Sequence, residues 1–147
     1  MATQSQSAVD AAKRGNTGLL QGRSFGVSLT VKDLQKSLSW YRDVMGFSVD
    51  RKIERDGVLR GVALKAGEVQ ISINQDDGAK GWERVKGEGF SLRITTDQNI
   101  DEIARRIKEQ GGTLDLEPTD MPWGARAIRL RDLDGYRLSI SSVIPPR

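Results

Sequence analysis

The chain has 147 residues, of which 37% are hydrophobic and 29% are charged, enough for one domain with a substantial core. Its net charge of +3 comes from interspersed Lys, Arg, Asp and Glu, so we expect no nucleic-acid partner. The absence of His and Cys excludes disulfides, thiolate nucleophiles, Ser-His-Asp catalysis and the commonest ligands of transition metals.

The sequence also argues against membrane insertion and secretion. No apolar run approaches the roughly 20 residues that span a bilayer, and the N-terminus lacks the apolar region of a signal peptide. We therefore expect no membrane partner and a cytoplasmic location. Residues 1–23 are rich in Ser, Gln, Ala and Gly, and we predict a flexible tail there, with a short helix around residues 8–14.

The first ordered unit is predicted to have the order β-α-β-β-β. Alternating apolar residues indicate strands, Asp33 is suited to begin a helix, and Gly46 is suited to end it. An Asp-Gly pair at residues 56–57 is typical of a hairpin turn. The expected elements are a strand over residues 25–31, a helix over 34–45 and strands over 47–54, 58–65 and 68–74.

The same order is predicted again after a polar, Gly-rich connection over residues 76–88. The last two strands should form a hairpin in which Asp132 pairs with Tyr136 across an Asp-Leu-Asp-Gly loop. Both aspartates are interpreted as turn-forming residues. The expected elements are a strand over residues 90–96, a helix over 100–110, a strand over 113–117, a loop over 118–123 and the closing hairpin.

The two units match each other along the sequence. Ser28 and Gly46 correspond to Arg93 and Gly111 at a spacing of 65 residues, and residues 69–73 match residues 136–140. Two copies of a unit that cannot bury its sheet alone imply one pseudo-two-fold domain. We therefore predict a single domain over residues 24–142, divided into a first module (24–76), a linker (77–88) and a second module (89–142), with a C-terminal tail over 143–147.

Four motifs resemble the vicinal oxygen chelate superfamily, which contains glyoxalases, bleomycin-resistance proteins and extradiol dioxygenases. They are Val-Ser-Leu-Thr-Val-Lys-Asp-Leu at 27–34, Trp-Tyr-Arg-Asp-Val-Met-Gly-Phe at 40–47, Trp-Gly-Ala-Arg at 123–126 and Asp-Leu-Asp-Gly-Tyr at 132–136. Leu133 stands where the family usually has Pro. The resemblance covers about residues 25–142 and implies an α+β fold, in which two βαβββ modules form a curved mixed-sheet cup with helices packed outside.

Enzymes of this family hold a metal on the cup face of four strands, usually with two His and one or two Glu. The resemblance places these positions at Gly26, Ser72, Ser91 and Ser139. Neutral hydroxyls and a glycine do not supply the imidazole or carboxylate ligands that Zn, Fe and Mn need. We therefore predict no metal and no cofactor, and we do not expect metal-dependent glyoxalase or dioxygenase activity.

The residues expected on the cup face are polar, rich in hydroxyls and basic. Their arginines could present charged forks to an anionic ligand, or they could lie on exposed sheet or at a dimer seam. Trp123 begins the last hairpin and could form a lip over the cup. The candidate ligand-binding residues are Ser28, Thr30, Gln70, Ser72, Ser91, Arg93, Trp123, Arg129, Arg137 and Ser139.

The favoured function is a homodimeric, metal-independent small-molecule-binding protein of the glyoxalase/bleomycin-resistance type, with a ligand that could be anionic. The alternatives are a metal-free isomerase or lyase that uses Tyr, Arg or a rim carboxylate, a metal-dependent enzyme with non-standard ligands, and a structural interaction module. No general base can be assigned, which argues against an enzyme. The sequence leaves open whether one chain closes the cup or two chains share it.

Overall fold

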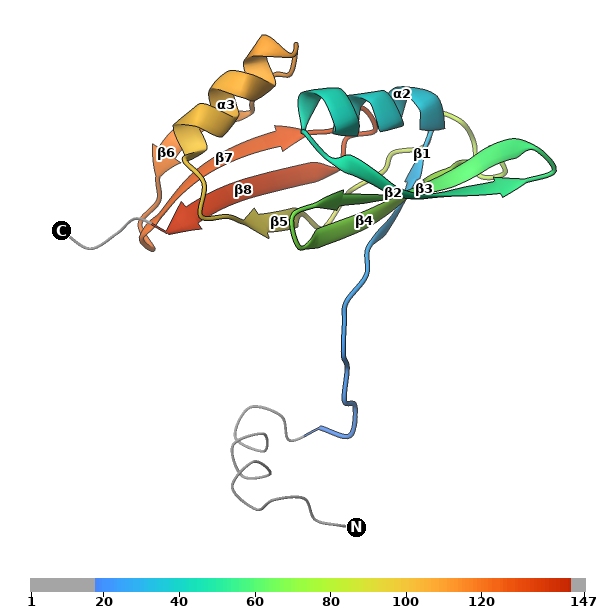
Figure 1. Cartoon of the computed structure of the whole chain (residues 1–147), viewed down its shortest axis with the longest axis horizontal. Helices are drawn as coiled ribbons and strands as arrows, with labels where there is room; N and C mark the ends of the chain where they lie inside the picture. Colours follow the sequence, from blue (N-terminus) through green and yellow to red (C-terminus); the bar gives the residue numbers. More distant parts are fainter. Residues whose placement is uncertain (1–17, 144–147) are drawn as a thin grey trace.

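The computed structural model describes residues 18–143 and shows two four-stranded sheets side by side, each with its own helix (Figure 1). The helix expected around residues 8–14 lies outside the described residues. The first module consists of β1 (Ser28–Val31), α2 (Leu34–Ser39), the π-helical turn η1 (Trp40–Val44), β2 (Ser48–Arg55), β3 (Val58–Ala66) and β4 (Val69–Gln75). The second consists of β5 (Leu92–Thr95), α3 (Ile100–Glu109), β6 (Leu116–Asp120), β7 (Ala125–Arg131) and β8 (Arg137–Val143).

The two sheets have the same topology. The strand orders are β1-β4-β3-β2 and β5-β8-β7-β6, and in each sheet the first strand pairs in parallel with the last while the other pairs are antiparallel. The register repeats as well, since Ser28 lies opposite Ser72 and Arg93 lies opposite Ser139. The predicted α+β fold of two βαβββ modules is therefore confirmed, and so is the predicted register of the closing hairpin.

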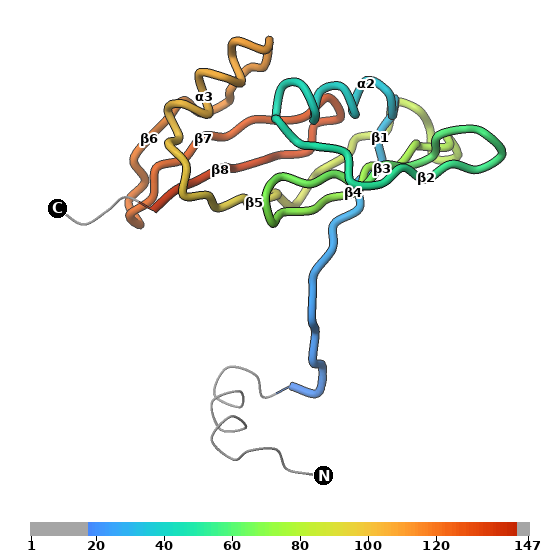
Figure 2. The backbone as a smooth tube through the Cα atoms, viewed as in Figure 1, coloured from blue at the N-terminus to red at the C-terminus, as the bar shows by residue number. Residues whose placement is uncertain are grey.

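The core lies between the sheets and the helices. Both α2 and α3 pack on the same side of the sheets, and within residues 18–143 the opposite side carries no helix (Figures 1 and 2). Strand alternation directs one set of side chains toward the helices, and these are apolar in both modules. One continuous cluster results, which includes Val62 and Ile73 of the first sheet and Ile128 and Ile140 of the second. Burial of each such side chain contributes about 1.5–3 kcal/mol.

The helix predicted over residues 34–45 is interrupted. It is regular only in α2, after which the Met45 N–H donates to the Trp40 carbonyl at 3.1 Å, a π-helical bond. The ring of the fully buried Tyr41 packs edge-on against Trp40 and Phe47, with ring centroids 4.9 and 5.6 Å apart. The Tyr41 hydroxyl reaches across to the second module and donates to Asp132 at 2.6 Å. Helical periodicity in the sequence does not reveal the extra residue in this turn.

Two predicted strand boundaries are wrong. The first strand begins at Ser28 and not at residue 25, which leaves Phe25 exposed. The strand predicted over 113–117 lies instead at Leu116–Asp120, so Pro118 is part of a strand and not of a loop. Proline is tolerated there because β6 is an edge strand whose pairing with β7 is irregular between Leu116 and Thr119.

A buried polar junction ties the linker to both modules. The Lys86 ammonium lies 3.2 Å from the Asp76 carboxylate and 3.6 Å from that of Asp134, and all three side chains are almost fully buried. A hydrogen bond from the Gly78 N–H, followed by the bond from Lys86, holds the pKa of Asp76 below its usual value. Asp134 also accepts the Lys32 N–H at 2.8 Å. The linker thereby joins the end of β4 to the β7–β8 loop.

The β7–β8 loop is organised by Asp132, as predicted for a turn-forming residue. Its carboxylate accepts the backbone N–H groups of Asp134 and Tyr136, both at 2.9 Å. Burial raises the pKa of Asp132, and burial beside this carboxylate raises the pKa of Tyr41 as well.

Among residues 18–143, no helix is long and apolar enough to cross a lipid bilayer.

Candidate functional site

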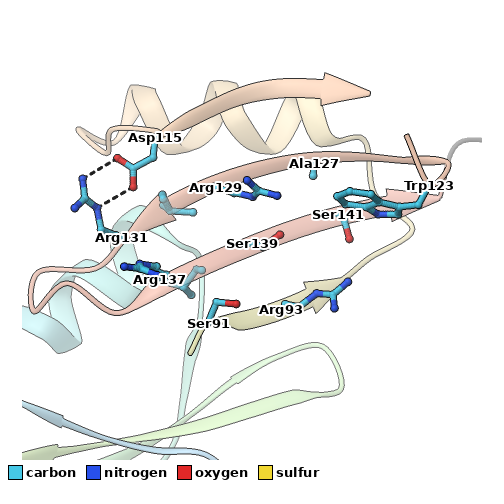
Figure 3. Close-up of a pocket in the computed structure, with 12 residues that line it drawn as sticks. Ser91, Arg93, Asp115, Trp123, Ala127, Arg129, Arg131, Arg137, Ser139 and Ser141 are labelled. Carbon is cyan, nitrogen blue, oxygen red and sulfur yellow. Dashed lines mark hydrogen bonds and ion pairs between the residues drawn. The ribbon is translucent and has the colours of Figure 1, made fainter. Parts of the chain in front are cut away.

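The helix-free face of the second sheet carries a row of three polar side chains. Arg129 of β7 lies opposite Ser139 of β8, which lies opposite Arg93 of β5. Neighbouring strands are about 4.8 Å apart, so the two arginines flank the serine at roughly 10 Å from each other at their Cα atoms. Both come from positions that strand alternation directs away from the helices. Figure 3 shows the two guanidinium groups on either side of Ser139.

This face forms a hollow of about 680 Å³, which we call the second-module hollow. Its volume lies in the range of ordinary small-molecule sites. All six candidate residues of the second module line it. The lining residues are Ser91, Arg93, Asp115, Trp123, Ala127, Arg129, Leu130, Arg131, Arg137, Leu138, Ser139 and Ser141.

The four candidate residues of the first module lie elsewhere. Ser28, Thr30, Gln70 and Ser72 are on β1 and β4 of the other sheet and do not line the second-module hollow. Their polar groups meet neighbours of their own module, since Asn74 donates to the Ser28 hydroxyl and Gln70 donates to Asp50. Within one chain, the ten candidate residues therefore fall into two groups on two sheets.

The second-module hollow is strongly positive. Of its four arginines, Arg131 makes a two-pronged ion pair with Asp115 at 2.9 and 3.1 Å, and this pairing raises the pKa of Arg131. Among residues 18–143, the structure shows no ion-pair partner for Arg93, Arg129 or Arg137. Asp115 is the one carboxylate among the lining residues, and Arg131 already neutralises it. Three guanidinium charges therefore remain uncompensated around the hollow.

Some arginines outside the hollow are held in ion pairs. Arg126 of β7 is held by both Asp101 and Asp120 at 2.8 Å, and hydrogen bonds from these two carboxylates raise its pKa. Arg105 is paired on α3 with Glu102 and Glu109. The described part of the chain therefore pairs some arginines with acids and leaves several others without an ion pair, and three of the unpaired arginines gather around this one hollow.

Sequence reasoning missed several lining residues. Arg131 and Ser141 follow the strand alternation that identified Arg129 and Ser139, so the period of β7 and β8 could have revealed them. Asp115 lies just before β6, in a segment that was predicted as the strand itself. Its pairing with Arg131 depends on how that edge strand lies against β7, and no local pattern in the sequence reports it.

The residues at the family's metal positions do not fit a transition metal. Ser91 and Ser139 line the second-module hollow, whereas Ser72 and Gly26 belong to the first-module side. These positions offer hydroxyl groups and no carboxylate, imidazole or thiolate. Within residues 18–143, no three His, Cys, Asp or Glu residues gather closely enough to hold a metal ion. The chemistry of this face is therefore that of arginine forks, hydroxyl groups and one tryptophan.

Comparisons with known proteins agree with the fold. The family model of the Glyoxalase/Bleomycin resistance protein/Dioxygenase superfamily matches residues 25–140. The chain is similar to a probable lactoylglutathione lyase from Synechocystis, with 25% identity over 118 residues that cover 76% of this chain and 88% of that protein.

Solved structures show the same architecture. A superfamily member from Sphaerobacter thermophilus superposes with a TM-score of 0.66 at 26% identity, covering 82% of this chain and 98% of that one. TioX from Micromonospora sp. ML1 superposes with a TM-score of 0.65 at 21% identity, covering 84% of this chain and 100% of that one. With its two βαβββ modules and a family match over most of its length, the chain belongs to the glyoxalase/bleomycin resistance protein/dioxygenase superfamily.

Proposed function

We propose that this protein binds a small molecule in the second-module hollow without a metal. The observation that carries the proposal is the set of three uncompensated arginines around a hollow of about 680 Å³. Holding like charges together on one sheet face is unfavourable unless an anion or solvent compensates them. A ligand with negative charge would supply that compensation through charge-assisted hydrogen bonds.

The first module provides an internal control for this argument. By strand register, its residues Ser28, Ala63 and Gln70 occupy the positions of Arg93, Arg129 and Arg137. A sheet of the same topology therefore forms with no arginine at any of these places. The fold does not require the arginines, and this favours a binding role for them.

A metal-free enzyme is the weaker alternative, because the residues that could transfer a proton are engaged elsewhere. The Tyr41 hydroxyl donates to Asp132, and the Tyr136 hydroxyl donates to the Thr30 carbonyl at 2.8 Å. Burial raises the pKa of both tyrosines, so neither readily becomes a base. Asp115 is paired with Arg131. The lining of the hollow therefore offers no free general base.

Lactoylglutathione lyase activity, which the names of the curated relatives suggest, is a second alternative. Their identity to this chain is 25%, and the donor groups at the family's metal positions do not fit the metal. We therefore favour a binder over a lyase. As for assembly, we propose a homodimer, because the hollow is built by one module and lies on the side of the sheets that neither α2 nor α3 covers. Light scattering should give twice the mass of one chain, and the mass of a monomer would refute the proposed homodimer.

Thermal stabilisation tests the main proposal. A library of small molecules is screened for compounds that raise the melting temperature, since a ligand at 100 times its Kd stabilises the folded state by about 2.7 kcal/mol. The variant Ser139→Trp fills the hollow, and it should lose the response to any true hit. Arg106→Trp on the exposed face of α3 is the matched control and should keep the response.

The fate of the compound separates the binder from an enzyme. After prolonged incubation with stoichiometric protein, a hit that chromatography recovers unchanged supports binding alone. Conversion of the compound by the parent protein, lost in Ser139→Trp, would establish an enzyme instead. Equal stabilisation of the parent and Ser139→Trp by every hit would rule out the second-module hollow as the binding site.

A further inference from the structure

The second-module hollow has two chemically different ends. Trp123 lies at one end, near Ser141, and Arg137 lies at the other, next to the Arg131–Asp115 pair (Figure 3). The row of Arg129, Ser139 and Arg93 crosses the space between them. A ligand that contacts both ends of the hollow must therefore combine negative charge with an apolar surface that can pack against an indole ring.

Trp123 is positioned by a built turn. The Gly124 N–H donates to the Met121 carbonyl at 3.1 Å, the Met121 N–H donates to the Ala125 carbonyl at 2.7 Å, and Gly124 has the positive φ that the turn needs. The indole is nevertheless 62% exposed and lines the hollow together with small side chains, including Ala127 and Ser141. An indole this exposed contributes little to folding, but its face can stack with a flat ring.

The first module again serves as the control. The corresponding turn joins β2 to β3 and consists of Asp56 and Gly57, with no aromatic residue. Both the tryptophan and the arginines are therefore present in the second module and absent from the matching places of the first. The two features vary together, which indicates that they serve one ligand.

The dimensions are compatible with one molecule touching both features. Ser139 and Ser141 are two residues apart on β8, a distance of about 6.8 Å along an extended strand. One or two fused six-membered rings with an acidic substituent span this distance. The acid would lie over Ser139 between the two arginine forks, with the ring beside Trp123.

We propose that the ligand is an aromatic oxyanion, a flat ring bearing a carboxylate or phosphate, with its acid between Arg93 and Arg129 and its ring against Trp123. This inference rests on the proposed binding function of the second-module hollow and names the class of ligand. A cation is disfavoured by the three unpaired guanidinium charges, and a non-aromatic acid leaves the indole face unused. Arg137 lies at the far end of the hollow and is available to a second acidic group.

Calorimetric titration with matched probes tests the class. The probes are 2-naphthoate, 2-naphthyl phosphate, the neutral 2-naphthamide and the non-aromatic cyclohexanecarboxylate. At least one aromatic oxyanion should bind about tenfold or more tightly than both the amide and the cyclohexane acid, because a charge-assisted bond and a stacked ring are each worth about that factor. Comparison of the carboxylate with the phosphate shows which acid the arginine pair prefers.

Single substitutions test which side chain contacts which part of the ligand. Arg129→Gln and Arg93→Gln should each weaken the aromatic oxyanion about tenfold, and Trp123→Leu should weaken it while leaving cyclohexanecarboxylate unchanged. Lys65→Gln removes one positive charge from the first-module face and should change the affinity less than about twofold. Thermal melting of each variant verifies that it is folded, which is expected because Arg93, Arg129 and Trp123 are exposed and Lys65 is only half-buried.

The outcomes separate this inference from the proposed function. Equal affinity for naphthoate and naphthamide, or no effect of either arginine variant, overturns the inference. If a neutral library compound stabilises the parent but not Ser139→Trp and no aromatic acid binds, the binding function stands and the ligand class is wrong. If the arginine variants abolish dimerisation without changing affinity, the arginines belong to an interface, and the inference is again overturned. Failure of every compound to bind refutes both proposals.

Discussion

The two modules of this protein share one backbone topology but carry different side chains on the helix-free face of their sheets. Val62 and Ile73 pair on the helix side of the first sheet, and Ile128 and Ile140 occupy the same places in the second. On the other side, Ser28 and Ala63 stand where the second module has Arg93 and Arg129. The comparison shows that strand alternation places the core-packing residues on one face of the sheet and the candidate site residues on the other. One face can acquire new chemistry while the other keeps the fold.

The polar faces also differ in how their groups are satisfied. In the first module, Ser28 and Gln70 find partners within the same sheet, namely Asn74 and Asp50. In the second, Asp115 compensates one arginine of the hollow, and three arginines find no acid among the described residues. Among the described residues, Lys65 on the first-module face also shows no ion-pair partner, so the second-module face differs in gathering three unpaired arginines around one hollow, where a ligand, a partner or solvent can compensate them.

The largest expected effect comes from breaking the junction between the modules. Lys86→Ala should lower the free energy of unfolding by about 3–5 kcal/mol, because it removes the only buried cation beside Asp134 and leaves Asp76 with the more exposed Arg84, at 3.4 Å, as its ion-pair partner among the described residues. Urea denaturation measures this loss. Lys80→Ala, an exposed lysine of the same linker, is the matched control and should change stability by less than about 0.5 kcal/mol. A near-neutral Lys86→Ala would show that the modules do not depend on this contact.

Core truncation tests the symmetric side of the comparison. Ile73→Ala and Ile140→Ala remove equivalent buried side chains, and each should cost about 2–5 kcal/mol. Both variants should unfold in a single urea transition, since the core cluster is continuous across the modules. Two separate transitions in either variant would mean that the modules unfold independently.

The pH dependence of stability tests the β7–β8 loop. The corresponding turn of the first module, between β3 and β4, is shorter and has no equivalent of Asp132. Burial raises the pKa of Asp132 in the folded state above its unfolded value of about 3.9. Between these two values the folded state binds the proton and the unfolded state does not, so stability increases as the pH falls. Relative to Asp132→Asn, the parent should therefore gain stability on acidification from neutral pH down to about 3.9. A parent that loses stability relative to the variant in this range would contradict the raised pKa.

The smallest effect on stability should come from replacing the three unpaired arginines of the second module with the residues at the matching positions of the first module. The triple variant Arg93→Ser, Arg129→Ala and Arg137→Gln should change the free energy of unfolding by less than about 1 kcal/mol, because no ion pair of the described residues is lost. The same variant should lose all binding of aromatic oxyanions. A loss of about 3 kcal/mol or more in urea denaturation would show that the arginines are structural.

Prediction from the sequence succeeded where the physical cause is local. The pairing of Ile128 with Ile140 follows from the alternation of the closing hairpin and from its Asp-Gly loop, and the register agrees. Prediction from the sequence was less successful at the boundaries of helices and strands. The π-turn around Tyr41 depends on packing with Phe47 and on the hydrogen bond to Asp132, which lies 91 residues away. Pro118 was placed in a loop because its tolerance in a strand depends on the edge position of β6.

The candidate site divides in the same way. By itself, the sequence determined which residues share the polar face, because the period of a strand assigns each side chain to one side. It also determined that His and Cys are absent and that arginine stands in the second module where the first has none. Only the tertiary structure decided that Asp115 neutralises Arg131 and leaves Arg129 free, and that the ten candidate residues divide between two sheets. Those outcomes depend on how strands distant in sequence are arranged, and no local pattern encodes that arrangement.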